Sequence, residues 1–216
     1  MSITNHNYYH LYNRGCDRDL IFFKESHYFL LLRLIKKNHQ KFKIRIIAYC
    51  LMPNHYHLLI GSPVIQSSEG LSGKNHPNQT DVSPKLSEGL KNPEPVSQFI
   101  RNTFNSYVQT VNPDMQRKGT LFESKCKSIW IDKEIYLLQL IRYIHLNPVL
   151  ACLCSQPEDW TYSNCREWLG LRKGTLFSNN FFNTYFTNFE QYRDFLQSYK
   201  EDKLFQAKMK KYGFGL

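Results

Sequence analysis

The sequence lacks any hydrophobic run that approaches the roughly 20 apolar residues of a membrane helix. Its first residues also lack the basic start and the apolar stretch of a secretion signal. We therefore expect a protein of the cytoplasm with no membrane partner. In that reducing compartment the six cysteines are expected to be free thiols. Cys152 and Cys154 have the wrong spacing for a zinc motif and no second pair accompanies them, so a cysteine zinc site is not expected.

Acidic residues are few compared with basic ones. The chain has 28 Lys and Arg against 18 Asp and Glu, a formal net charge of +10. Residues 1–60 hold nine basic and three acidic side chains, and residues 96–150 hold seven and four, so the excess is concentrated in these two parts. Nucleic acid is the first candidate for an acidic partner, with a solvated basic surface as the alternative.

Aromatic residues are missing from one long segment, residues 63–95, although they make up 15% of the whole chain. The segment is rich in Ser, Pro, Gly and Asn, and it cannot bury enough apolar surface to offset the entropy lost on ordering. We predict that it is a flexible insertion inside a domain of residues 1–175. Residues 176–216, which are aromatic and basic, are predicted to form a C-terminal helical extension.

Hydrophobic periodicity outside this segment predicts four strands and three longer helices. The expected strands are residues 7–13, 43–51, 55–60 and 128–131, and the expected helices are residues 24–38, 96–111 and 134–146, the last ending before Pro148. The order is strand, helix, strand, strand, helix, strand and helix. It predicts a ferredoxin-like α+β fold, with an antiparallel sheet and helices packed on one face.

Two histidines in the third predicted strand form the sharpest local pattern. His55 and His57 flank Tyr56, so both imidazoles project from one face of the strand while the tyrosine projects from the other. Imidazoles about 7 Å apart along a strand can share a divalent metal ion. Two ordinary half-buried histidines are the alternative for so short a pattern.

Tyr107 lies near the centre of the apolar face of the predicted helix 96–111. That face must pack on the sheet, so its phenol could be aimed at the histidine pair. The alternative is a core tyrosine whose hydroxyl bonds to the backbone.

Four segments occur in the order found in a known family. They are residues 9–15 (YHLYNRG), 52–57 (MPNHYH), 119–128 (GTLFESKCKS) and 141–149 (IRYIHLNPV). Together they resemble the single-tyrosine HUH transposases of the insertion-sequence type, especially the REP-associated branch. The resemblance covers about residues 8–170, interrupted by the insertion.

This resemblance implies an enzyme that nicks and rejoins single-stranded, hairpin-containing DNA through a 5′-phosphotyrosine intermediate. It implies His55 and His57 as metal ligands, Tyr107 as the nucleophile, and Mg²⁺ or Mn²⁺ as the cofactor. A nucleoid-associated location follows from such a substrate. Both monomers and homodimers fit the family.

One position departs from the family pattern. A third metal ligand, Gln or a similar residue, is expected one helical turn after the tyrosine, where this chain has Val111. Gln109, Asn112 and Glu123 stay open as substitutes. Basic residues at family-like positions are expected to contact DNA phosphates, namely Arg14, Lys125, Lys127 and Arg142. Candidates for stacking on unpaired bases, or for core packing, are Tyr8, Tyr9, Tyr12 and Trp130.

Two other functions remain as alternatives. A non-catalytic single-strand nucleic-acid binder could use the same fold, although the Gly-Phe-Gly-Phe type run of RNA-reading domains is absent. A phosphodiesterase with two separated histidine motifs is the third, but His10 and His145 lack matching neighbourhoods.

Overall fold

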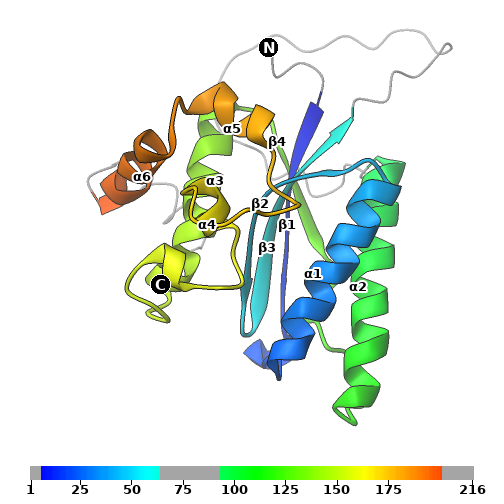
Figure 1. Cartoon of the computed structure of the whole chain (residues 1–216). Helices are drawn as coiled ribbons and strands as arrows, with labels where there is room; N and C mark the ends of the chain where they lie inside the picture. Colours follow the sequence, from blue (N-terminus) through cyan, green and yellow to red (C-terminus); the bar gives the residue numbers. More distant parts are fainter. Residues whose placement is uncertain (1–5, 64–92, 201–216) are drawn as a thin grey trace, which may run out of the picture.

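A single antiparallel sheet organises the protein (Figure 1). The computed structural model describes residues 6–63 and 93–200. Its strands are β1 (His6–Arg14), β2 (Arg45–Met52), β3 (His55–Pro63) and β4 (Lys127–Ile131), in the sheet order β2-β3-β1-β4. The predicted α+β fold with a mainly antiparallel sheet is confirmed.

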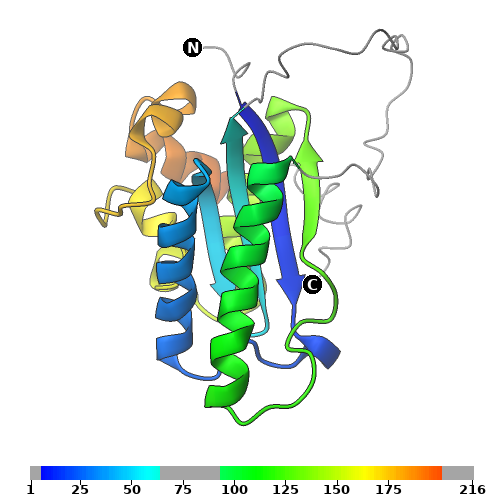
Figure 2. The same ribbon diagram turned by 90° about the vertical axis from the view of Figure 1, so that its right-hand side faces the viewer.

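The two faces of the sheet carry different helices (Figures 1 and 2). Helices α1 (Glu25–Lys41) and α2 (Glu94–Asp114) cover one face, where their apolar side chains pack on Leu58 and Ile60. Helix α3 (Glu134–Leu150) covers the opposite face, where it packs against Cys50 and Leu59. The helices therefore lie on both sides of the sheet: α1 and α2 pack together on one face, as predicted, and α3 packs on the other.

The predicted insertion at residues 63–95 lies almost entirely outside the described residues. The predicted insertion is too long at both ends, because Pro63 belongs to β3 and both Glu94 and Pro95 belong to the first turn of α2. Proline is suited to the first turn of a helix, where its missing N–H would have no intrahelical partner.

Helix α3 continues beyond Pro148, where the sequence predicted its end. The last turn remains closed, since the Ala151 N–H donates to the Asn147 carbonyl at 2.9 Å. A proline in the last turn removes one i to i−4 hydrogen bond while neighbouring bonds survive. The extra turn keeps Asn147 inside the helix, and its side chain is buried there.

The C-terminal helices pack around Trp168 at the outer side of α3. Helix α4 (Cys165–Trp168) contributes this tryptophan, and α5 (Asn179–Tyr185) and α6 (Phe189–Gln197) surround it with aromatic rings. Ser178 and Asn188 cap α5 and α6 by accepting backbone N–H bonds. The short helices η2 (Cys16–Arg18), η3 (Pro157–Asp159) and η4 (Ser198–Lys200) complete the secondary structure of the described residues.

Asn164 connects this helical layer to the edge of the sheet. Its Nδ2 donates to the Ile47 carbonyl at 3.0 Å, and its Oδ1 accepts the Tyr49 N–H at 2.7 Å. These two bonds orient the amide, so His145 Nε2 must donate to Oδ1 at 2.9 Å. His145 Nδ1 then accepts the Tyr192 hydroxyl. One buried chain of hydrogen bonds thus joins β2, α3 and α6.

Two expectations from composition can be compared with the structure. All six cysteines lie in the described residues and none forms a disulfide, as expected. Among the helices of residues 6–63 and 93–200, none is long and apolar enough to cross a membrane.

Replacing Asn164 tests this connection. Asn164→Leu keeps the volume but leaves the Tyr49 N–H and the His145 Nε2–H without their acceptor. We expect the free energy of unfolding to fall by about 3 kcal/mol, since each orphaned buried group costs about 1–3 kcal/mol. Urea denaturation measures the change. Asn180→Ala, at an exposed position of α5, is the control and should stay within about 0.5 kcal/mol of the wild type. Equal stabilities of the two variants would contradict this reading of Asn164.

Candidate metal and tyrosine site

His55 and His57 project from the first residues of β3 toward α3, on the same face of the sheet. The alternation predicted from the sequence is present, because Tyr56 projects into the opposite core and stacks on Phe104 at 4.4 Å between ring centroids. His57 is buried at 4% exposure, and His55 is half-buried at the end of the sheet. The centroids of the two imidazole rings are 5.2 Å apart.

Each of these histidines has a partner at Nδ1. Asn54 donates from Nδ2 to the Arg18 carbonyl, which turns its Oδ1 toward His55. His55 Nδ1–H donates to that oxygen at 2.7 Å. His57 Nδ1 lies 3.0 Å from Nε2 of the buried His10. Both Nε2 atoms are therefore the ring nitrogens that face α3.

Helix α3 presents Tyr143 and Asn147 to these two nitrogens. The residues are four apart, so their side chains lie on one face of the helix, one turn from each other. The Tyr143 hydroxyl lies 3.4 Å from His57 Nε2, and Asn147 Oδ1 lies 3.0 Å from His55 Nε2. A tyrosine, an amide and two imidazoles from β3 and α3 thus converge at one point.

Burial controls the protonation of the site. It lowers the pKa of His57 well below 6.5, with further lowering from His10 and His55, and it lowers the pKa of His55 as well. Both rings are therefore neutral near pH 7, the form that binds a metal ion. Burial raises the pKa of Tyr143, and a hydrogen bond with the Asn147 side chain opposes that rise.

The donor set fits a divalent cation. His55 donates its Nδ1–H to Asn54, so its Nε2 and the Asn147 Oδ1 face each other as two acceptors. A cation between the two atoms would satisfy both lone pairs, as would rotation of the Asn147 amide so that its Nδ2 donates to Nε2. An imidazole nitrogen and an amide oxygen are both metal-ligand types in proteins. Among the described residues no group of three or more His, Cys, Asp or Glu could hold a metal ion, and the third polar group beside the two imidazoles is the Asn147 amide.

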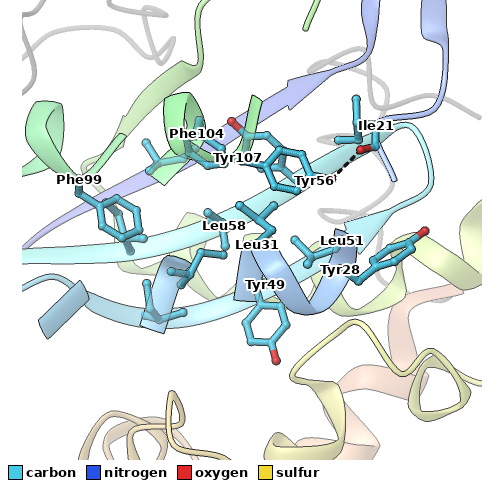
Figure 3. Close-up of a cluster of buried hydrophobic side chains, with 14 of the residues drawn as sticks. Ile21, Tyr28, Leu31, Tyr49, Leu51, Tyr56, Leu58, Phe99, Phe104 and Tyr107 are labelled. Carbon is cyan, nitrogen blue, oxygen red and sulfur yellow. Dashed lines mark hydrogen bonds between the residues drawn. The ribbon is translucent and has the colours of Figure 1, made fainter. Parts of the chain in front are cut away.

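Tyr107 is not part of this convergence. Its ring lies in the core between the sheet and helices α1 and α2 (Figure 3). This is the face into which Tyr56 projects, opposite to that of His57. Its hydroxyl donates to the Ile21 carbonyl at 2.6 Å, and burial raises the pKa of the phenol. The expectation that this phenol faces the histidine pair is wrong, because α2 packs on the other side of the sheet. The alternative, a core tyrosine with a backbone partner, is what the structure shows.

The suggested third ligands also lie away from the histidines. Val111 is buried beside α2's other apolar residues, and Gln109 is exposed on the same helix. Asn112 donates to the Gly119 carbonyl, and Glu123 forms an ion pair with Arg14. The amide that lies beside the histidines is that of Asn147.

The four basic residues differ in their surroundings. Arg14 is exposed and pairs in register with His55, so it lies beside the site, held by Glu123. Lys127 is exposed on the same face, with Nζ 5.7 Å from the ring centroid of Tyr12, and Lys125 is exposed nearby in sequence. Arg142 is buried at 2% exposure and its guanidinium lies 3.8 Å from the ring centroid of Phe195 in α6. The expected phosphate contact of Arg142 is therefore contradicted: this residue holds the C-terminal helix.

The sequence contained a signal for the residues that were missed. Tyr143 and Asn147 both lie in the quoted segment 141–149, and they have the spacing of a tyrosine followed one turn later by an amide. The residue at the same spacing after Tyr107 is Val111. His10, whose neighbourhood in the sequence is uninformative, was found only through its contact with His57. His145, considered beside it, is bound to Asn164 and Tyr192 on the outer side of α3.

Comparison with known proteins gives a match to a family model over part of the chain and a similar fold. Residues 3–70 match the family model described as "Transposase IS200 like". The structure is similar to that of a REP-associated tyrosine transposase bound to a REP hairpin, at 13% identity and a TM-score of 0.55, over 83% of this chain and 94% of that one. A protein from Deinococcus radiodurans described as a transposase shares 14% identity over 67% of this chain and 92% of its own, at a TM-score of 0.38. No curated protein matches the sequence.

The buried hydrogen bond of Tyr107 leads to a prediction about the stability of the protein. Tyr107→Phe removes the donor to the Ile21 carbonyl and keeps the ring packed on Phe22 and Phe122. We expect the free energy of unfolding to fall by about 1 kcal/mol, the usual contribution of one buried hydrogen bond. Chemical denaturation checks this value. A variant as stable as the wild type would show that this hydroxyl contributes nothing to the core.

Proposed function

We propose that this chain, which matches an IS200-like transposase model over residues 3–70, is a metal-dependent enzyme that nicks and rejoins single-stranded DNA through Tyr143. The observation that carries the proposal is the convergence of Tyr143 and Asn147 of α3 on His57 and His55 of β3. A fold shared with a REP-associated tyrosine transposase supports it.

In the proposed reaction the Tyr143 oxygen attacks the scissile phosphorus and the bond to the 3′-oxygen breaks. The phenol gives up its proton, the leaving 3′-oxygen gains one, and the DNA 5′-phosphate remains esterified to the tyrosine. Because the ester replaces a phosphodiester with little change in bond energy, attack by another 3′-hydroxyl can rejoin a strand.

His55, His57 and Asn147 are the proposed ligands of Mg²⁺ or Mn²⁺. Asn54 orients the His55 imidazole through its Nδ1 atom, which is the usual way in which outer residues fix ligating histidines. When bound, the cation would polarise the scissile phosphate and stabilise the charge that develops on it. All three ligands and the tyrosine come from one chain, so the site needs no second copy of the protein.

The proposed path of the DNA strand runs over the exposed edge of the same face. Lys127, Tyr12 and His57 pair in register across β4, β1 and β3, so they form one row on the sheet. The exposed Lys127 suits a phosphate, and the half-buried ring of Tyr12 suits an unpaired base. The structural neighbour is bound to a REP hairpin, and we propose hairpin-containing DNA as the partner of this chain too.

The nucleophile can be identified by a covalent adduct. Wild-type protein, Mn²⁺ and single-stranded, hairpin-containing oligonucleotides taken from the DNA on either side of its gene should give an adduct that survives boiling in detergent. Only a 3′ label should appear in it, because the fragment that carries the 5′-phosphate is the one esterified. Chelator should abolish the adduct. Tyr143→Phe should lose it completely and retain DNA binding.

Tyr107→Phe is the matched control, since it removes one hydroxyl from another buried tyrosine and should leave the adduct intact. An adduct lost in Tyr107→Phe but kept in Tyr143→Phe would overturn the assignment of the nucleophile. Nicking without any adduct would identify water as the nucleophile and the protein as a nuclease. Binding without nicking would favour the non-catalytic binder.

Lys127→Ala tests the proposed strand path. Loss of one phosphate contact should weaken single-stranded DNA binding and reduce the slope of log K against log salt by about 0.7. Fluorescence anisotropy at several salt concentrations measures both quantities. Lys36→Ala is the control, because Lys36 is exposed on α1, which covers the opposite face of the sheet. A greater effect of the Lys36 variant would place the strand on the other side of the molecule.

A further inference from the structure

His10 is a buried histidine beside the site with no part in the reaction described above. It lies on β1 at 2% exposure, and its Nε2 is 3.0 Å from His57 Nδ1. The strand register places His10 opposite Leu59 and Tyr12 opposite His57. The His10 side chain therefore reaches its partner diagonally, a contact that long or aromatic side chains can make between neighbouring strands.

Two ring contacts hold His10 in this orientation. Its ring stacks on Tyr12 with centroids 4.8 Å apart and planes inclined by 25°, and it lies edge to edge with His57, with centroids 5.1 Å apart and planes inclined by 24°. A stacked, buried imidazole cannot turn without disturbing both neighbours. The nitrogen that faces His57 is therefore fixed by packing.

A hydrogen bond between two imidazole nitrogens contains one proton, so the pair has two possible arrangements. If His10 donates, His57 carries its own proton on Nε2, and this nitrogen cannot bind a cation. If His57 donates from Nδ1, its Nε2 keeps a lone pair directed at Tyr143. The choice between these tautomers decides whether His57 can act as a ligand.

We propose that His10 is a positioning residue that accepts the His57 Nδ1–H and so holds His57 in the tautomer whose Nε2 faces α3 and binds the metal ion. This inference rests on the proposed function, which makes His57 a ligand. His10 does for His57 what the Asn54 side chain does for His55. His55 is thus oriented by the Asn54 amide, and His57 by the imidazole of the buried His10.

Two variants separate the acceptor from the packing. His10→Phe keeps a stacked ring and removes the acceptor. His10→Gln offers an amide oxygen near the position of the lost Nε2. We expect His10→Phe to weaken Mn²⁺ binding about 10- to 100-fold, the usual cost of losing an outer partner of a ligating histidine, and His10→Gln to recover most of the affinity. Electron paramagnetic resonance of free Mn²⁺ measures binding without any DNA substrate.

Tyr8→Phe is the control for disturbance of β1, because Tyr8 is a buried residue two positions before His10 on the same face of the strand. Its affinity for Mn²⁺ should equal that of the wild type. Independently, ¹⁵N spectra of the metal-free wild-type protein report the tautomer of His57, assigned by the signals that His57→Gln loses. We expect a protonated Nδ1, and in His10→Phe a shift of the population toward protonated Nε2.

The outcomes distinguish the two proposals. A wild-type His57 protonated at Nε2, or a tautomer unchanged in His10→Phe, overturns the role of His10 whatever the metal does. Equal Mn²⁺ affinities of His10→Phe and the wild type, with binding lost in His57→Gln, overturn it and leave the metal site standing. Unchanged binding in His57→Gln refutes the metal site, and the spectra alone then decide the positioning role.

Discussion

The alternation of side chains along β3 is the constraint on which the rest of the site depends. Because successive residues of a strand face opposite sides, His55 and His57 must share one face and Tyr56 must enter the core on the other. Any group that acts with the histidines has to come from the elements that cover their face. Helix α3 covers it and α2 does not, so the side on which each helix packs selects the tyrosine.

Because the site depends on which helix covers which face of the sheet, only part of it could be predicted from the sequence. Periodicity and turn residues were sufficient for the strands, the main helices and the shared face of His55 and His57, since all of these are local properties. Which face of the sheet a helix covers depends on how the chain crosses the sheet. The apolar stripe of α2 could pack on either face, so it does not decide this. Tyr107 was therefore placed on the wrong side. The spacing from Tyr143 to Asn147 was present in the sequence, but the predicted helix end before Pro148 left the amide outside the helix.

Helix α3 joins the proposed chemistry to the stability of the C-terminal layer. One of its faces carries Tyr143 and Asn147 toward the histidines, and the opposite face carries Arg142 and His145 toward α6. Asn164 links His145 to the edge of β2, so the helix is fixed to the sheet from behind. The distance between Tyr143 and His57 is thus set by hydrogen bonds and ring contacts outside the site itself.

Burial has opposite effects on the two halves of the proposed site. It keeps His55 and His57 neutral, the form in which an imidazole binds a metal ion, and it also raises the pKa of Tyr143, which opposes formation of the phenolate. Some positive charge must offset this second effect when the phenol attacks. Among the described residues near the site, Arg14 is already paired with Glu123, and Arg142 faces α6. In the proposed function a divalent cation held by the neutral histidines would supply this charge, so the desolvation that raises the pKa of Tyr143 also prepares the proposed ligands of the ion that offsets it.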